Sequence, residues 1–275
     1  MKHVVYSHQG QAMPEHVTPI REDAFLVKDH TELRWLGGAG VLINCRGTIL
    51  LADPLLMGFD MPLLIDSPLM VEHTPNVDAI LITHIDNDHF SRETITALAP
   101  VTRSLHAPSY VAGEALKLGA PAVGHDIGES FDVGPVRVRL TPARHNWQNG
   151  LPEFAFRRWE EKDYCGFWLD TPDGSIWLPG DSRLLDSHLT MPQPDVILFD
   201  FSDNDWHITL DGAVRLANTY PEAKLLCIHW GTVDAPAMTP FNGDPNALTD
   251  RVTHPERIFA LCPGEALSLG AGREE

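Results

Sequence analysis

Four side chains of metal-binding types fall close together in the segment THIDNDHF, which runs from Thr83 to Phe90. They are His84, Asp86, Asp88 and His89, and the segment directly follows a short apolar run. A loop that leaves an apolar strand places its first polar side chains at the edge of a sheet, where layered α/β folds often build ligand sites. His84 and Asp86 can present from one side of this loop, while Asp88 and His89 reach across it. Two pairs of ligands indicate two metal ions.

A metal site at this edge needs further ligands from elsewhere in the chain. Three more polar residues stand in equivalent places, each at the end of an apolar or alternating run: His145 after LTPAR, Asp181 in LPGDS and His229 in LLCIHWGT. Any one of them alone reads as an ordinary loop residue, and Gly-Asp-Ser is a common turn. Together with the first segment they predict a dinuclear metal site.

Such a site implies metal-assisted hydrolysis. A divalent ion lowers the pKa of its bound water from 15.7 to about 7, and a second ion steadies the developing oxyanion or the leaving oxygen. The attacking group is then a metal-bound hydroxide, so no nucleophilic side chain is needed. Ser182 lacks the glycine pattern of a nucleophile elbow, and Cys227, two residues before His229 on a strand, is expected to pack in the core.

Hairpins and helices must bring these residues together. GVLINCRGTILLADP predicts two strands around a turn at Arg46-Gly47, and FDVGPVRVRLTPARH and YCGFWLDTPDGSIWLPGDS predict hairpins that end at His145 and Asp181. The other predicted elements are helices after Ser91, near 108–118 and over 210–219, and strands at 195–200, 224–229 and 266–268. Strands first in meanders and then interleaved with helices predict an α/β fold of two mixed β-sheets between helix layers.

Length and composition indicate one domain. The chain has 275 residues, 43% of them hydrophobic, and we expect a single unit, 1–275, with an N-terminal extension over 1–30 and a core over about 33–268. A formal charge of -18 repels phosphate backbones, so nucleic acid is not an expected partner. No apolar signal region or membrane-spanning run is present, which predicts a cytoplasmic protein without a transmembrane segment. The four cysteines lack a CxxC spacing and suggest neither a structural zinc site nor a disulfide framework.

The chain resembles the metallo-β-lactamase fold hydrolases, because THIDNDH is similar to their His-x-His-x-Asp-His signature. The segments GGAGVLINCRGTILLADP, VDAILITH, TPARHNW, CIHWGT and CPGE are similar to the branch that contains ascorbate-6-phosphate lactonase and N-acylphosphatidylethanolamine phospholipase D. The resemblance covers about residues 33–268 and implies a four-layer αββα sandwich with two divalent metal ions at one sheet edge.

The resemblance also assigns roles to single residues. It implies that the first metal is bound by His84, Asp86 and His145, the second by Asp88, His89 and His229, with Asp181 bridging both. It matches Asp53 to an aspartate that orients the ligand loop, and His207 to a histidine that faces the metals in the phospholipase branch. We assign catalytic roles to Asp88 and His207. The ordinary alternatives are that Asp53-Pro54 is a turn and that His207 is a surface residue beside a helix.

This chain departs from the family pattern at Gly38, which is not a ligand position, and at Asp86, where the pattern has a second histidine. Two divalent ions carry +4, so Asp88, Asp181 and a bridging hydroxide leave +1, and adding Asp86 brings the sum to 0. The site should attract anions less and hold a more basic hydroxide. A carboxylate also moves the metal preference from zinc toward manganese or iron, although zinc accepts carboxylates too.

We therefore expect a dinuclear hydrolase of an ester, lactone or phosphodiester, with a small-molecule substrate. The loop LLMGFDMPLLIDSPLM and the segment NWQNGLPEFAFRRWEEKDY, with Arg157, Arg158 and Trp159, would suit a bulky substrate that has an acidic or acyl part. They would equally suit a buried loop or a contact between subunits of a homo-oligomer. The rival interpretation is a non-hydrolytic member, either a di-iron redox protein or a metal-free small-molecule binding protein.

Overall fold

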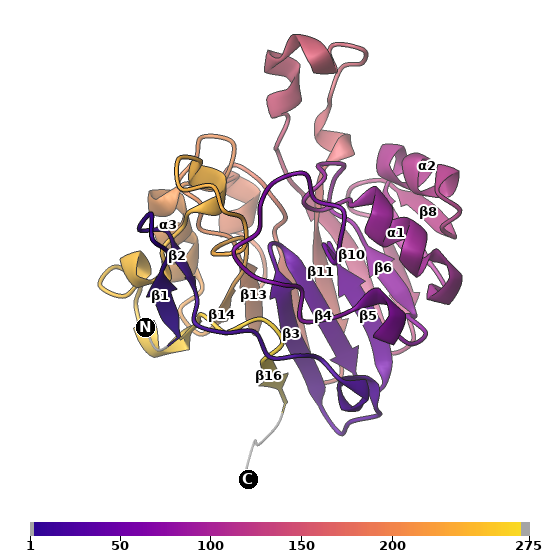
Figure 1. The fold of residues 1–275 in the computed structure, drawn as a ribbon, viewed down its shortest axis with the longest axis horizontal. Coiled ribbons are helices and arrows are strands. Elements are labelled where there is room, and N and C mark those ends of the chain that lie inside the picture. Colours follow the sequence, from indigo (N-terminus) through magenta and orange to yellow (C-terminus); the bar gives the residue numbers. More distant parts are fainter. Residues whose placement is uncertain (1–2, 271–275) are drawn as a thin grey trace.

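The computed structural model describes residues 3–270, which form two large β-sheets flanked by helices (Figure 1). One sheet has seven strands in the order β16-β3-β4-β5-β6-β7-β8, and the other has seven in the order β15-β14-β13-β12-β11-β10-β9. A separate pair of strands, β1 (Val4–Tyr6) and β2 (Ala12–Pro14), forms an antiparallel hairpin near the N-terminus.

The elements have the following bounds. The first sheet consists of β3 (Thr31–Gly37), β4 (Gly40–Cys45), β5 (Thr48–Ala52), β6 (Ala79–Leu81), β7 (Leu105–Pro108), β8 (Ala122–His125) and β16 (Ala266–Leu269). The second consists of β9 (Ser130–Val133), β10 (Val136–Pro142), β11 (Cys165–Thr171), β12 (Gly174–Leu178), β13 (Val196–Phe199), β14 (Lys224–Cys227) and β15 (Ile258–Phe259). The α-helices of the described residues are α1 (Arg92–Leu98), α2 (Ser109–Lys117) and α3 (Leu210–Thr219).

The main core lies between the two sheets. Strand β4 is apolar on both faces: Val41 and Ile43 point into the cluster shared with Phe167 of the second sheet, whereas Leu42 belongs to a second buried cluster. That second cluster includes Ile95 of α1 together with residues of α2, so these helices cover the outer face of the first sheet. Continuous apolar strands are typical of sheets buried on both faces.

Helix α3 covers the second sheet on its other side. Ala213, Leu216 and Ala217 are its buried residues, and they belong to the same cluster as the β13 and β14 side chains. The layers therefore run helix, sheet, sheet, helix, which confirms the predicted αββα sandwich of two mixed sheets.

Parallel strands determine where the loops meet. In the first sheet β5, β6, β7 and β8 are parallel neighbours, and in the second β12, β13, β14 and β15 are. The carboxyl ends of parallel neighbours lie at one edge of a sheet, so the loops that follow them collect there. The segment between β10 and β11 extends from the body of the molecule and carries short 3₁₀ helices (Figure 1).

The predicted elements agree closely with the observed ones, and the structure adds some. The helix predicted over 210–219 is α3, and both predicted hairpins form, as β9-β10 and β11-β12. The added strands are β1, β2, β3 and β15. In β3 the polar Glu32 and Arg34 alternate with Leu33 and Trp35, which is the period-two signal of a strand. Among the described residues no helix is long and apolar enough to cross a membrane.

Candidate metal centre

The ligand loop is fixed to the end of the neighbouring strand. Asp53 follows β5 with a positive φ of 40° and accepts hydrogen bonds from the Thr83 backbone N–H at 2.8 Å and from the Thr83 hydroxyl at 2.7 Å. Strand β6 runs parallel to β5, which places Asp53 beside the start of the loop. At the other end of the loop, Ser91 caps helix α1 by accepting from the Thr94 N–H at 3.1 Å.

The structure brings the seven predicted ligand residues to one place. Two groups of donor atoms form, each with all atoms within 4.8 Å of one another. The first group is His84, Asp86 and His145, and the second is Asp88, His89, Asp181 and His229. They follow the carboxyl ends of β6, β10, β12 and β14. Strands β6, β12 and β14 belong to parallel pairs, and β10 runs in the same direction as β12 because both are antiparallel to β11.

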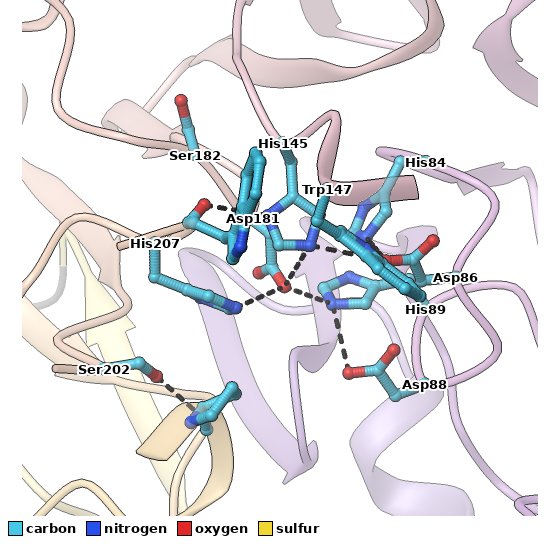
Figure 2. A network of polar contacts seen from close by, with 12 residues as sticks. His84, Asp86, Asp88, His89, His145, Trp147, Asp181, Ser182, Ser202 and His207 are labelled. Atoms are coloured by element: carbon cyan, nitrogen blue, oxygen red, sulfur yellow. Dashed lines mark hydrogen bonds and ion pairs between the residues drawn. The ribbon is translucent and has the colours of Figure 1, made fainter. Parts of the chain in front are cut away.

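Asp181 lies between the two groups (Figure 2). Its Oδ2 is 3.1 Å from Nε2 of His89 and 3.5 Å from Nε2 of His229 in the second group. The same oxygen is 3.9 Å from Nε2 of His145 in the first group. A carboxylate in this position has oxygen within reach of both groups.

The histidines direct their Nε2 atoms at the centre because their Nδ1 atoms are engaged elsewhere. Nδ1 of His89 donates to Asp53 at 2.9 Å, Nδ1 of His145 donates to the Trp206 carbonyl at 2.9 Å, and Nδ1 of His229 donates to the Pro240 carbonyl at 3.0 Å. Metal-binding histidines are usually oriented in this way, by a carboxylate or carbonyl that holds the second nitrogen. The matched role of Asp53 agrees with this contact.

The two ring nitrogens of His84 have different surroundings. Its Nδ1 donates to the Thr83 hydroxyl at 3.0 Å, since that hydroxyl gives its own hydrogen to Asp53. This leaves Nε2 as an acceptor, and it is buried without a hydrogen bond among the described residues, since Asp86 Oδ2, 3.3 Å away, is also an acceptor. Buried polar atoms are rarely left unpaired, so the surroundings of His84 Nε2 fit the role of a metal ligand.

Asp86 points toward the centre and is firmly held. Its Oδ2 lies 3.3 Å from Nε2 of both His84 and His145. Trp147 donates its indole N–H to the same oxygen at 2.7 Å, and Gln148 donates to Oδ1 at 2.6 Å. An ionised carboxylate oxygen accepts more than one bond, so Oδ2 can take the indole hydrogen and still face the two histidines.

Charges at the site depend strongly on one another. Burial works against protonation of His229, but Asp181 and other carboxylates outweigh it and raise the His229 pKa to about 10. Burial would raise the pKa of Asp181, yet the surrounding histidines, His229 foremost, hold it well below its usual range. Burial lowers the pKa of His84, and His89 adds to this. Carboxylates that stay charged at this depth need positive charge beside them, which protonated histidines or bound metal ions can supply.

His207 joins the same site without being one of the seven. Its Nδ1 donates to Asp200 at 2.8 Å, and its Nε2 lies 3.7 Å from Oδ2 of Asp181. It is 4% exposed, so the alternative of a surface histidine beside a helix is wrong. Asp200 follows β13, and the Ser202 hydroxyl donates to its other oxygen at 2.7 Å.

A cavity of about 610 Å³ opens over the site, and its lining includes Asp86, Asp88, His145, Asp181, His207 and His229. Both loops predicted beside the substrate contribute to it, through Phe59 and Met61 from the first and Trp147 and Leu151 from the second.

Three residues of the second loop do not reach the cavity, contrary to the expectation that they would meet a substrate. Arg157, Arg158 and Trp159 are not part of the lining. Arg157 pairs with Asp163 at 2.6 Å and lies over the Tyr110 ring, while Trp159 is buried. Arg157 and Trp159 both contact Tyr110 of α2, and these contacts hold the loop to the body of the protein.

Sequence reasoning missed several residues that hold the site. Trp147, Gln148 and Asp200 contact predicted site residues, and Tyr164 donates to Gln148 Oε1 at 2.6 Å. The available signal was position: Trp147 and Gln148 come two and three residues after His145, and Asp200 follows a strand as Asp181 does. Ser182 and Cys227 stay outside the chemistry, since the Ser182 hydroxyl donates to the Arg183 carbonyl and Cys227 is buried in the core.

Comparisons with known proteins support the same fold. The Beta-lactamase superfamily domain matches residues 41–230, more than half of the chain. A UPF0173 metal-dependent hydrolase from Caldivirga maquilingensis is 26% identical over 245 residues, which cover 86% of this chain and 97% of that protein.

Solved structures resemble the chain over most of its length. Isothiocyanate hydrolase from Delia radicum gut bacteria superposes with a TM-score of 0.71 at 17% identity, covering 87% of this chain and 100% of that one. CmlA, a diiron beta-hydroxylase from Streptomyces venezuelae, superposes with a TM-score of 0.62 at 16% identity, covering 88% of this chain and 55% of that one. The chain therefore belongs to the β-lactamase superfamily, with the metallo-β-lactamase fold and with metal-dependent hydrolases among its relatives.

Proposed function

We propose that this protein is a dinuclear metal-dependent hydrolase that cleaves an uncharged ester or lactone with a bulky apolar part. The observation that carries the proposal is the convergence of seven His and Asp donors in two groups beside a cavity. One metal ion would be bound by His84, Asp86 and His145 and the other by Asp88, His89 and His229, with Asp181 between them.

The donor set fits divalent metal ions. The buried Nε2 of His84 has no hydrogen bond among the described residues and is an acceptor that a cation would satisfy, and the Nε2 atoms of His89, His145 and His229 converge on Asp181. Bound divalent ions would supply hydroxide near neutral pH and would polarise the bond to be cleaved. Imidazole and carboxylate donors suit zinc, manganese or iron, and manganese gains from the three carboxylates.

His207 is the side chain best placed to act on the substrate or the leaving group. Its Nδ1–H is held by Asp200, so Nε2 is presented to the cavity beside Asp181. An imidazole fixed in this way can accept a hydrogen bond from the substrate through Nε2 or, when protonated, donate one. Asp88 has a different place: its Oδ2 lies 3.2 Å from Nε2 of His229, so its catalytic role would be to hold the second ion.

The cavity favours an uncharged substrate. Among the described residues its lining has no lysine or arginine, while Asp60 joins the aspartates of the site. Phe59, Leu151, Trp206 and Phe241 provide apolar and aromatic walls. Phosphodiesters carry a negative charge that such a lining does not balance, so esters and lactones fit better than the phosphodiester alternative. The structural neighbour isothiocyanate hydrolase acts, by its name, on another uncharged electrophile.

A matched substrate comparison tests the bond type. The protein loaded with manganese or zinc is assayed with a neutral aryl ester, an aryl-substituted lactone and a bis-aryl phosphodiester, and kcat/KM is compared. We expect the neutral substrates to give the higher values. Faster cleavage of the phosphodiester would contradict the substrate class while leaving hydrolysis intact.

A ligand variant tests the metal centre itself. His145→Ala should lose at least one metal ion per chain and most hydrolytic activity, because it removes a donor from the first group. The fold should persist, since the core of this large sandwich does not depend on the ions. His30→Ala, which removes a partly exposed histidine paired with Asp29, is the control. Full activity and two ions in His145→Ala would make the ligand assignment wrong.

A di-iron redox protein is the second candidate. Asp86 favours it, because a carboxylate in place of an imidazole hardens the donor set and moves preference toward iron. The neighbour CmlA is a diiron beta-hydroxylase. Elemental analysis of protein purified without added metal decides: two manganese ions or at least two zinc ions support hydrolysis, two iron ions support redox chemistry, and no metal supports a small-molecule binding protein.

A further inference from the structure

A second cluster of metal-binding side chains lies apart from the dinuclear centre. His3 precedes β1, His16 follows β2, and Cys262 lies between β15 and β16. One donor atom of each lies within 4.8 Å of the others. The segments are joined directly, since the Thr18 N–H donates to the Pro263 carbonyl at 2.8 Å. In Figure 1 the β1-β2 hairpin lies among the segments coloured yellow and orange, which come late in the sequence.

Both imidazoles of this cluster are oriented by carboxylates. Nδ1 of His16 is 3.5 Å from the Cys262 sulfur, and its Nε2 is 3.5 Å from Glu265 Oε1. Nδ1 of His3 lies 3.4 Å from Glu15 Oε2, which leaves Nε2 of His3 available to bind a metal ion. Each histidine thus has one nitrogen against a carboxylate and a second nitrogen that can bind a metal, which in His16 faces the Cys262 sulfur. This arrangement is typical of zinc-binding histidines.

The cysteine is held where the imidazoles meet it. Cys262 is buried, and its backbone N–H donates to Glu265 Oε2 at 2.9 Å, so the same glutamate contacts both Cys262 and His16. The rings of His3 and His16 lie 5.8 Å apart between centroids and nearly perpendicular, at 83°. Edge-to-face rings do not stack over one another, so both can turn a nitrogen toward the sulfur.

We propose that His3, His16 and Cys262 bind one zinc ion, separate from the dinuclear centre. Thiolate and imidazole are the donors that zinc prefers, whereas manganese favours oxygen. In tetrahedral zinc sites the metal lies about 2.0 to 2.3 Å from its ligands, so ligand atoms are separated by roughly 3.5 Å, as Nδ1 of His16 and the Cys262 sulfur are. The fourth position faces solvent and takes water, since the His16 side chain is 46% exposed.

The zinc ion would fasten the two ends of the described chain. It would join the β1-β2 hairpin, which carries its ligands at both ends, to the turn that leads into β16. The ligands are far apart in sequence and include one cysteine, so neither a CxxC spacing nor a local histidine pair announces the site.

Cobalt spectroscopy distinguishes this site from the dinuclear centre, whose donors are nitrogen and oxygen only. The full chain is loaded with Co²⁺ and its near-ultraviolet absorption is recorded. We expect a thiolate-to-cobalt charge-transfer band that disappears in Cys262→Ser and in His16→Ala. The control His254→Ala, an exposed histidine outside the cluster, should keep the band. With zinc, the same two variants should bind one equivalent less than the parent protein.

The site is also separable from catalysis. Cys262→Ser and His16→Ala should retain the two ions of the dinuclear centre and the parent hydrolytic rate, while the N-terminal segment becomes more susceptible to limited proteolysis. A cobalt-loaded parent protein without the charge-transfer band, or a zinc content unchanged in both variants, would overturn the proposal. Two variants are used because a folding defect in one leaves the other informative.

Discussion

Asp86 stands where the family pattern has a histidine, and the structure shows how its carboxylate is held. Trp147 and Gln148 donate to its two oxygens, and Tyr164 in turn orients Gln148. These donors come from the segment after His145, so the carboxylate is held from the side of the first ligand group. Comparison with the family pattern identifies aspartate in place of histidine at position 86, and the structure identifies the side chains that hold the carboxylate.

Asp86→His should change the metal preference of the protein. The substitution replaces an oxygen donor by nitrogen and adds one positive charge to the cluster, so affinity for zinc relative to manganese should rise. Competition titrations with both metals measure the ratio, and Asp86→Asn serves as a control that removes the charge without adding an imidazole. An unchanged ratio in Asp86→His would mean that Asp86 is only a loop residue.

Trp147→Phe tests the support of Asp86 directly. The change removes the indole N–H that donates to Oδ2 and keeps an aromatic ring in the cavity wall. Loss of such an orienting partner typically costs about 10- to 100-fold in metal affinity, and we expect this range. Trp168→Phe, which removes a comparable bond to Asp170, is the matched control. Equal metal affinity in the two variants would show that the bond to Asp86 is dispensable.

His207→Ala should reduce turnover while both metal ions stay bound. The reason is its position: Nε2 faces the cavity, whereas Nδ1 is taken by Asp200. A residue that transfers a proton contributes about 10²-fold or more to kcat. Metal analysis and steady-state kinetics on the same preparation check this. A variant with one ion missing would assign His207 to the ligands, and an unchanged rate would remove its catalytic role.

At the scale of elements, strand ends position the ligands and glycines permit the turns. Gly180 precedes Asp181 with φ of +71°, and a Cβ there would lie 2.5 Å from the Cys165 carbonyl oxygen. A side chain at this position strains the backbone and collides with a fixed main-chain atom. The orientation of Asp181 therefore depends on a glycine in LPGDS.

Gly180→Ala should weaken metal binding more than it weakens the fold. The displaced turn moves Asp181 away from His89 and His229, and small displacements of a ligand are costly. Gly113→Ala in α2 is the control, since its added Cβ would meet nothing within 4 Å and alanine favours a helix by up to about 1 kcal/mol. Metal titration and urea unfolding of both variants check the prediction. Normal metal affinity in Gly180→Ala would show that the turn adapts.

The sequence was informative wherever a ligand ends a strand. His145, Asp181 and His229 each follow an apolar or alternating run, so their position at one sheet edge could be predicted from local pattern. The contact between Trp147 and Asp86 could not, because it joins residues 61 positions apart and depends on how the two sheets stack. The pairing of His207 with Asp200 was likewise hidden, since an aspartate at a strand end is more often a turn residue.

Across the whole molecule, the two sheets are also joined by polar contacts outside the core. Asp173, in the turn between β11 and β12, pairs with Arg46 of the first sheet at 2.6 Å and accepts from the Thr31 hydroxyl at 2.8 Å. The hydrogen bond from Arg46 lowers the pKa of Asp173 below its usual value. Because the folded protein lowers the pKa of Asp173, the charged form of this carboxylate stabilises the fold.

Asp173→Asn should lower the free energy of unfolding at neutral pH only modestly, because Arg46 is half exposed and water screens the pair. A depressed pKa contributes stability that is present above the unfolded pKa of about 3.9 and is lost as pH falls through the folded pKa. The difference between parent and variant should therefore shrink between pH 7 and pH 3. Urea unfolding at both pH values measures it, and a constant difference would contradict the linkage.

The pairing of β16 with β3 has a consequence for biosynthesis. Strand β3 has β4 on one side and β16 on the other, so its outer edge stays open until residues 266–269 have left the ribosome. An unpaired edge strand invites pairing with other chains, and nascent chains are exposed to this for as long as translation lasts. His229 also emerges late, after most of both sheets. We therefore expect the first sheet and the metal site of the nascent chain to remain incomplete during most of translation. In this form the chain should be a substrate for chaperones.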